Sequence, residues 1–278
     1  MFQFIANIFG YLLEWLYNGI GQNYGIALIL FTIILRIILL PLTIKQQKSM
    51  KKTTALQGKM QEIQFKYKNN PELMNKEIME LYKRENLSPF SGCISSIVQI
   101  LIILSVFYLV SRPLTYMKKI DPGIIENYKN EISAENDGKI SNYYEIEIIQ
   151  KKAAQDENIK VNMDFLGLDL SKVPSQNMSD ATVYIIPLLY VVSSIFSIRM
   201  TTGKTKKKEG SNSSEPDMTQ QMNKSMSYMM PIMAVSIAFV APLGLALYWL
   251  VSNILMILER IVINKYVDSK EEKTLCLK

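Results

Sequence analysis

Residues 25–44 read GIALILFTIILRIILLPLTI and decide the fold. A helix of this length rises about 30 Å, which is the thickness of the hydrocarbon core of a bilayer. Fourteen of these residues are Ile, Leu or Phe. They favour insertion by about 4 to 8 kcal/mol, whereas one central arginine opposes it by about 2.5 to 3.5 kcal/mol. The stretch therefore predicts a membrane-spanning helix that carries Arg36 into the membrane.

Arg36 needs polar surroundings, because its guanidinium stays charged and carries five N–H donors that lipid tails cannot satisfy. None of the expected spans carries an acidic residue near its middle, and we therefore expect no internal Asp or Glu to pair with Arg36. Thr32 and Thr43 lie four residues before and seven residues after it, on the same helical face. These features predict a hydrated cavity with Arg36 on its wall.

The composition is that of a helical membrane core with sizeable polar parts, forming one membrane domain. Of 278 residues 49% are hydrophobic, and the mean hydropathy is +0.09. Histidine is absent, and the two cysteines, Cys93 and Cys276, are far apart. The chain therefore lacks the spacing of a disulfide framework or a metal site, and it contains no phosphate-binding G-x-x-x-x-G-K-[ST] motif. We expect no cofactor, no metal and no catalytic residue, so an intramembrane enzyme is the least favoured class.

Charge and hydropathy predict an all-α polytopic membrane protein with five transmembrane helices, its N-terminus outside and its C-terminus in the cytoplasm. Residues 45–90 contain ten basic and five acidic residues, which marks the cytoplasmic side. The expected segments are an outer interfacial helix (1–24), a first span (25–44), a cytoplasmic helical hairpin (45–92), a second span (93–112), an extracytoplasmic loop (113–181), a third span (182–200), a cytoplasmic linker (201–224), a fourth span (225–240), a fifth span (242–263) and a cytoplasmic tail (264–278).

Tyr11, Trp15 and Tyr17 suit a helix that lies in the membrane interface, although residues 1–24 can also be interpreted as a degenerate span. In the hairpin, residues 45–67 form one expected helix. Asn70 and Pro71 then open the second helix as N-cap and first helical residue.

Thin polar stripes recur on the other spans at a spacing of four residues. The pairs are Ser95 with Gln99, Ser193 with Ser197, Tyr248 with Ser252, and Trp249 with Asn253. Such residues either form hydrogen bonds between helices or line a cavity. The candidate groove residues are Arg36, Gln99, Trp249, Thr32, Thr43, Ser95, Ser197, Ser252 and Asn253.

Several of these stretches resemble the YidC/Oxa family of membrane protein insertases, in the order of that family and over most of the chain. They are YGIALIL (24–30), LRIILLPLT (35–43), KQQ (45–47), KYKNNPE (66–72), LYK (81–83), PFSGCI (89–94) with Gln99, MMP (229–231), PLGLALYW (242–249) and SN (252–253). The resemblance implies a five-span core with a cytoplasm-facing hydrophilic groove. The groove arginine of the family falls on Arg36, its second-span glutamine on Gln99 and its fifth-span aromatic on Trp249.

The resemblance implies an insertase and chaperone in a bacterial inner membrane. A polar segment of a nascent membrane protein would enter the groove and meet Arg36, and its apolar segment would pass into lipid. The implied partners are nascent membrane proteins and lipid, with the Sec translocon and the ribosome as further candidates and without recognition of a nucleic-acid sequence. The main rival is a small-anion transporter or channel with Arg36 as the binding charge, but the internal repeat typical of transporters is not visible.

Overall fold

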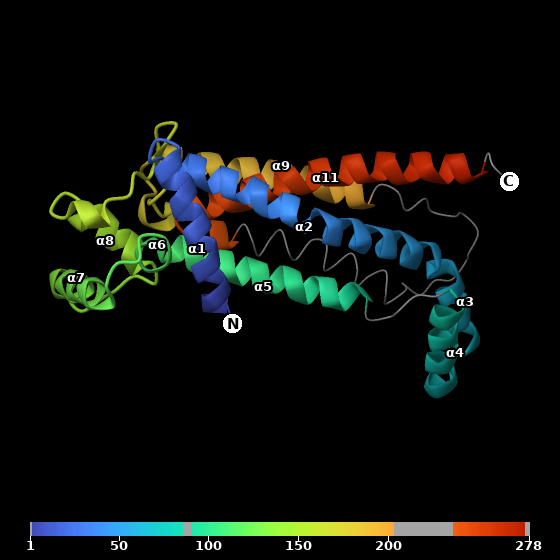
Figure 1. Cartoon of the computed structure of the whole chain (residues 1–278). Helices are drawn as coiled ribbons and strands as arrows, with labels where there is room; N and C mark the ends of the chain where they lie inside the picture. Colours follow the sequence, from blue (N-terminus) through green and yellow to red (C-terminus); the bar gives the residue numbers. More distant parts are fainter. Residues whose placement is uncertain (1, 86–90, 203–235, 276–278) are drawn as a thin grey trace. The chain divides into compact units, whose positions relative to one another are not determined.

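The computed structural model describes residues 2–85, 91–202 and 236–275, and Figure 1 shows their arrangement along the chain. The helices are α1 (Phe2–Gly19), α2 (Tyr24–Ala55), α3 (Gln57–Lys66), α4 (Pro71–Arg84), α5 (Ser91–Ser111), α6 (Pro113–Tyr116), α7 (Pro122–Glu135), α8 (Tyr144–Lys152), α9 (Ile185–Thr202) and α11 (Leu243–Leu275). The structure also has two short strands, β1 (Asp164–Phe165) and β2 (Leu168–Asp169), and the 3-10 helices η1 (Glu157–Ile159), η2 (Pro174–Gln176) and η3 (Ala181–Tyr184). The protein is mostly helical.

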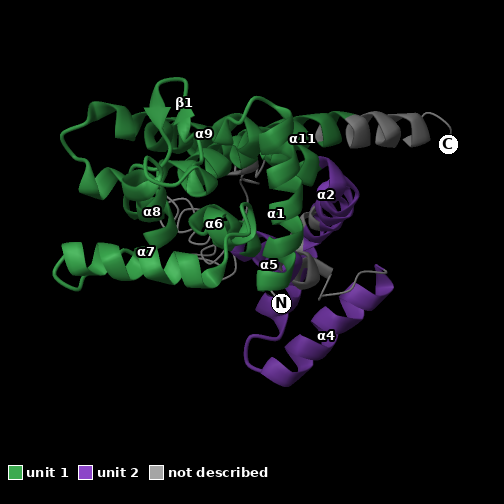
Figure 2. Ribbon diagram, turned by 60° about the vertical axis from the view of Figure 1, so that its left-hand side comes forward, with its two compact units in different colours: residues 1–36, 105–278 green, residues 37–104 purple. Residues whose placement is uncertain are grey.

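The chain divides into two compact units, coloured separately in Figure 2. Unit 1 contains residues 1–36 and 105–278, and unit 2 contains residues 37–104. Helices α2 and α5 each contribute to both units.

Three helical segments of the described chain are long and apolar enough to cross a membrane, namely Tyr24–Thr53, Ala181–Met200 and Leu243–Ile263. A shorter apolar helix covers Ile97–Ser111. The expected fourth span, 225–240, lies outside the described residues except for 236–240, which are helical. On α9 large apolar side chains such as Leu188, Val192 and Phe196 are exposed, while Ile186 is buried. A helix that is apolar on both faces is typical of a membrane span with one side towards lipid.

In unit 1, α9 packs against α11 and α1 packs against α6 (Figure 1). The contact between α1 and α6 is close because Gly10 has no side chain. A Cβ atom placed on Gly10 would stand 1.9 Å from the carbonyl oxygen of Tyr116. Helix α5 ends at Ser111, and α6 begins at Pro113, as expected from the Arg112–Pro113 step.

Residues 112–184 fold into a packed region with a core of its own. Helices α7 and α8 contact each other and bury Ile132, Ile148 and Ile149. Glu145 is fully buried on α8, where it accepts hydrogen bonds from the backbone N and the Oγ1 of Thr115 at 2.9 and 2.5 Å. These bonds join α8 to the start of α6, and burial raises the pKa of Glu145.

The same region adds a short β-hairpin to the mostly helical fold. Strands β1 and β2 pair in antiparallel register, with Asp164 opposite Asp169. Leu166 and Gly167 connect them with φ values of 55° and 79°, as in the two-residue turns whose twist matches a hairpin. The sequence signal was weak because Leu rarely occupies the left-handed region.

In unit 2, α3 and α4 form a helical hairpin. Asn70 caps α4 by accepting a hydrogen bond from the backbone N of Leu73, and Pro71 is the first helical residue, so the predicted start is confirmed. The prediction of a single helix over residues 45–67 was wrong. Helix α2 continues to Ala55, and α3 begins at Gln57 after the buried Leu56.

Candidate functional site

Arg36 on α2 lies against α11, with its side chain 14% exposed. Its Nη2 donates to the Oγ of Ser252 at 2.6 Å and to the backbone oxygen of Ser252 at 3.0 Å. Its Nη1 lies 3.6 Å from the Oε2 of Glu259, whose side chain is 12% exposed. One arginine therefore joins two residues that are seven positions, or two helical turns, apart on the same face of α11.

The expectation that no internal acid pairs with Arg36 was wrong, because Glu259 does so. Glu259 lies near the C-terminal end of the expected fifth span, away from its middle. A useful signal was the spacing of Ser252 and Glu259, which places a hydroxyl and a carboxylate on one stripe of the helix. A long arginine side chain can reach along such a stripe.

The two contacts of Arg36 differ in quality. The bond to Ser252 Oγ is short, whereas the 3.6 Å separation from Glu259 exceeds the 2.7–2.9 Å typical of a charge-assisted hydrogen bond. Glu259 Oε2 is buried and has no hydrogen-bond partner among the described residues. No described residue accepts a hydrogen bond from the Nε or Nη1 of Arg36. Among the described residues, the guanidinium is therefore anchored at Nη2, and its other N–H groups donate to no acceptor.

The other polar residues predicted on α2 are satisfied by their own helix. Thr32 is buried and donates to the backbone oxygen of Leu28 at 2.7 Å. Thr43, in unit 2, donates to the backbone oxygen of Leu39 at 3.2 Å. Their hydroxyl hydrogens are thus used within α2, which leaves the hydroxyl oxygens as acceptors.

Asn253 and the serines of α9 form a seam between α9 and α11. Asn253 donates from Nδ2 to the Oγ atoms of Ser193 and Ser194 at 2.8 and 3.3 Å. Ser197 is also buried on α9. Trp249 is half-buried, and its ring centroid lies 6.5 Å from that of Tyr190. For Asn253 the structure favours the interpretation as a hydrogen bond between helices. Its neighbour Ser252 points about 100° further around α11, towards Arg36.

Gln99 and Ser95 lie on α5 in unit 2. Gln99 is half-buried, and the side chain of Ser95 is outside the described part of the structure. That Gln99 and Thr43 share one groove with Arg36 stays a prediction.

The positions of Arg36 and Ser252 follow from how α2 and α11 begin. The backbone N of Tyr24, the first residue of α2, donates to the oxygen of Asn162 at 3.0 Å. The backbone N atoms of Leu243 and Gly244 donate to the oxygens of Lys172 and Leu170 at 2.9 and 2.8 Å. Residues 162–172 thus hold the first N–H groups of both helices, which otherwise lack partners.

From these anchors both helices run in the same direction. Arg36 follows Tyr24 by twelve residues, or about 18 Å, and Ser252 follows Leu243 by nine, or about 14 Å. An arginine side chain bridges the remaining difference. The register that brings Arg36 to Ser252 and Glu259 is therefore set by the folded region before α9.

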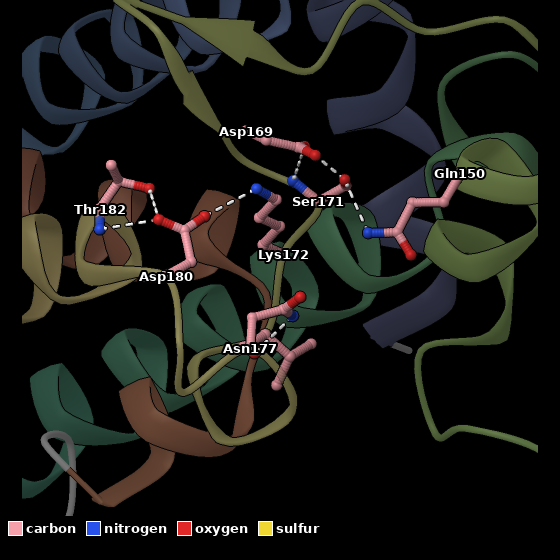
Figure 3. A network of polar contacts seen from close by, with 8 residues as sticks. Gln150, Asp169, Ser171, Lys172, Asn177, Asp180 and Thr182 are labelled. Carbon is pink, nitrogen blue, oxygen red and sulfur yellow. Dashed lines mark hydrogen bonds and ion pairs between the residues drawn. The ribbon is translucent and has the colours of Figure 1, made fainter.

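A second polar cluster lies in this region and is drawn in Figure 3. Gln150 donates to Ser171 Oγ at 2.8 Å, and Lys172 donates to Asp180 Oδ2 at 2.7 Å. Asp180 also accepts from the backbone N of Thr182 at 3.0 Å (Figure 3). The cluster borders a hollow of about 930 Å³ that is open to solvent. Lys172 and Asp180 pair with each other in this cluster, which is typical of charged residues with a structural role.

Within the described ranges, no group of three or more His, Cys, Asp or Glu residues is placed to hold a metal ion. The long apolar helices and the nearly buried Arg36–Ser252–Glu259 cluster define a helical membrane protein with a polar site inside its apolar part.

Comparison with known proteins places the chain in a family. The family model described as 60Kd inner membrane protein matches residues 15–271. The membrane protein insertase YidC of Treponema denticola is 28% identical over 261 residues, which cover 94% of this chain and 37% of that protein. The protein of the same description from Oceanobacillus iheyensis is 28% identical over 272 residues, which cover 95% of this chain and 85% of the relative.

A solved structure shares the fold. It is described as an active YidC insertase with the first transmembrane domain resolved, and it superposes with a TM-score of 0.51 at 21% identity. The match covers 92% of this chain and 45% of that one. The chain belongs to the 60Kd inner membrane protein family, the YidC/Oxa family, as its sequence motifs predict, and it is a membrane-integrated protein of a bacterial membrane. It spans 37% of the Treponema denticola relative and 85% of the Oceanobacillus iheyensis relative.

Proposed function

We propose that this protein is a membrane protein insertase and chaperone for nascent membrane proteins. The observation that carries the proposal is the side chain of Arg36, nearly buried beside α11 and with N–H donors at Nε and Nη1 that no described acceptor uses. An acidic or polar segment that enters this site would supply the missing acceptors. The relatives named as membrane protein insertases support the same activity.

The arrangement that goes with this function has five spans, the N-terminus outside and the C-terminus in the cytoplasm. The hairpin of α3 and α4 would lie in the cytoplasm, where its basic residues are expected. The groove would open to the cytoplasm, with Arg36, Gln99 and Thr43 along its wall and Trp249 towards its outer end. Nascent membrane proteins and lipid are the proposed partners, and the Sec translocon and the ribosome are further candidates.

The free energy for insertion would come from the substrate itself. Transfer of apolar surface out of water contributes about 25 cal/mol per Å². The exposed apolar face of α9, which includes Leu188 and Val192, would give an apolar segment a path into lipid. The membrane potential adds a force on an acidic translocated segment, about 2.3 kcal/mol per charge at 100 mV.

Reconstitution of Arg36 variants into liposomes tests the proposal. The substrate is a single-span model protein whose translocated tail carries two aspartates or, as a comparison, two asparagines. Arg36→Lys should keep most of the insertion because it keeps the charge, whereas Arg36→Ala should lower insertion of the acidic substrate about tenfold. Arg199→Ala, at the exposed end of α9, is the matched control. Equal insertion of the acidic substrate by all three Arg36 forms would refute the proposed role.

A further inference from the structure

Glu259 places a carboxylate where an acidic substrate residue is expected to bind. Its Oε2 lies 3.6 Å from Nη1 of Arg36, while Nη2 is held by Ser252. The carboxylate thus faces the side of the guanidinium that Ser252 leaves open. Both charged side chains are close to fully buried, at 14% and 12% exposure.

This contact differs from a structural ion pair. A structural pair inside a protein compensates its desolvation with short hydrogen bonds to both partners. Here the Arg36–Glu259 contact is longer than a hydrogen bond, and Oε2 has no hydrogen-bond partner among the described residues. Arg36 keeps its orientation through Ser252 instead, so the carboxylate can move away without releasing the arginine.

We propose that Glu259 is a specificity-determining residue, a resident counter-ion that an acidic residue of the passing segment must displace from Arg36. The proposal rests on the insertase function proposed above and concerns the same site. In the resting state Glu259 neutralises the guanidinium, which is otherwise costly to keep in an apolar environment. An acidic segment then exchanges one carboxylate for another, and the site selects segments whose acidic residues compete successfully.

The exchange predicts opposite effects for the two partners. Removal of the Glu259 charge leaves Arg36 with its full attraction for an acidic segment. Removal of the Arg36 charge leaves Glu259 alone in the site, where it repels an acidic segment. The defect of an Arg36 variant is therefore expected to come partly from the unpaired carboxylate, and neutralising Glu259 as well should relieve it.

The experiment compares Glu259→Gln, Arg36→Ala and the double variant in liposomes with the two model substrates. Glu259→Gln should raise insertion of the aspartate-tailed substrate about fivefold relative to that of the asparagine-tailed substrate. The double variant should insert the aspartate-tailed substrate about threefold better than Arg36→Ala alone. Glu126→Gln is the control, because it removes a carboxylate from an exposed pair with Lys129 on α7.

The outcomes separate this inference from the function on which it rests. If Glu259→Gln lowers insertion of both substrates equally, or if the double variant is no better than Arg36→Ala, Glu259 is a structural residue and the inference is overturned. If the wild-type protein inserts neither substrate, the proposed function fails and the inference with it. Should Glu259→Gln not fold, Glu259→Asp withdraws the carboxylate by one methylene and should raise insertion of the acidic substrate about twofold. An equal loss on both substrates in that variant would again overturn the inference.

Discussion

Single residues decide how charge is tolerated in this protein. Arg36 lies among apolar helices and finds polar partners there, because Ser252 supplies two acceptors and Glu259 supplies the opposite charge. Glu145, by contrast, is a fully buried carboxylate held by Thr115, in the region outside the spans. In both cases a hydroxyl residue orients the charged group.

Asp180 offers a test of stability at the same scale. It accepts a hydrogen bond from Lys172 and caps η3 by accepting from Thr182, and these bonds lower its pKa to about 2 from 3.8. A carboxylate with a lowered pKa stabilises the folded state above its unfolded pKa, and this contribution disappears as the pH falls through the folded pKa. Asp180→Asn should therefore lower Tm at neutral pH, and its difference from the wild type should vanish between pH 3.8 and about 2.

Thermal unfolding in detergent over that pH range measures the effect. Asp137→Asn is the matched control, because Asp137 is exposed and asparagine tolerates its positive φ of 52°. A difference between Asp180→Asn and the wild type that persists unchanged at pH 2 would contradict the assignment.

At the scale of elements, the contact between α1 and α6 depends on one missing side chain. A Cβ atom at Gly10 would clash with the backbone of Tyr116 at 1.9 Å, and backbone atoms cannot move aside as a side chain would. Gly10→Ala should therefore destabilise the protein by about 1 to 3 kcal/mol, even though alanine is the better helix former.

Gly19→Ala makes the same substitution on the same helix, at a position where a Cβ atom meets nothing within 4 Å. It should leave Tm unchanged or raise it slightly. The two variants are compared by thermal unfolding and by amide exchange of residues 2–19. Equal behaviour of the two would show that α1 does not depend on close packing at Gly10.

At the scale of the whole molecule, the proposed groove should be accessible from the cytoplasmic side of the membrane only. In a background with Cys93 and Cys276 replaced, cysteines at Arg36, Thr43 and Gln99 should react with a membrane-impermeant thiol reagent added from the cytoplasmic side. They should be silent to reagent added from outside, because the outer end of the groove is expected to be closed around Trp249. Leu166, 86% exposed in the turn between β1 and β2, is the control for labelling from outside. Labelling of position 36 from the outer face would favour the channel instead.

Much of this organisation could be predicted from the sequence. Features that depend on neighbours within a few residues were predictable. They are the span around Arg36, the cap of α4 at Asn70, and the end of α5 before Arg112 and Pro113. The break at Leu56 and the turn at Leu166 could not be predicted. Leu56 is buried by contacts that its neighbours in sequence do not reveal, and Leu166 adopts a positive φ that leucine rarely adopts. The pairing of Asn253 with Ser193 was one of two interpretations that the spacing left open.

The sequence by itself determined the apolar helices and the presence of an arginine in a span, because insertion depends on the composition of about 20 consecutive residues. It also determined the family, through its motifs. Only the tertiary structure decided which groups meet that arginine. Ser252 and Glu259 lie more than 200 positions away along the chain, and they reach Arg36 because residues 162–172 bind the first N–H groups of both α2 and α11. The register between two helices is a long-range property that no local pattern encodes, and here it places a carboxylate beside Arg36.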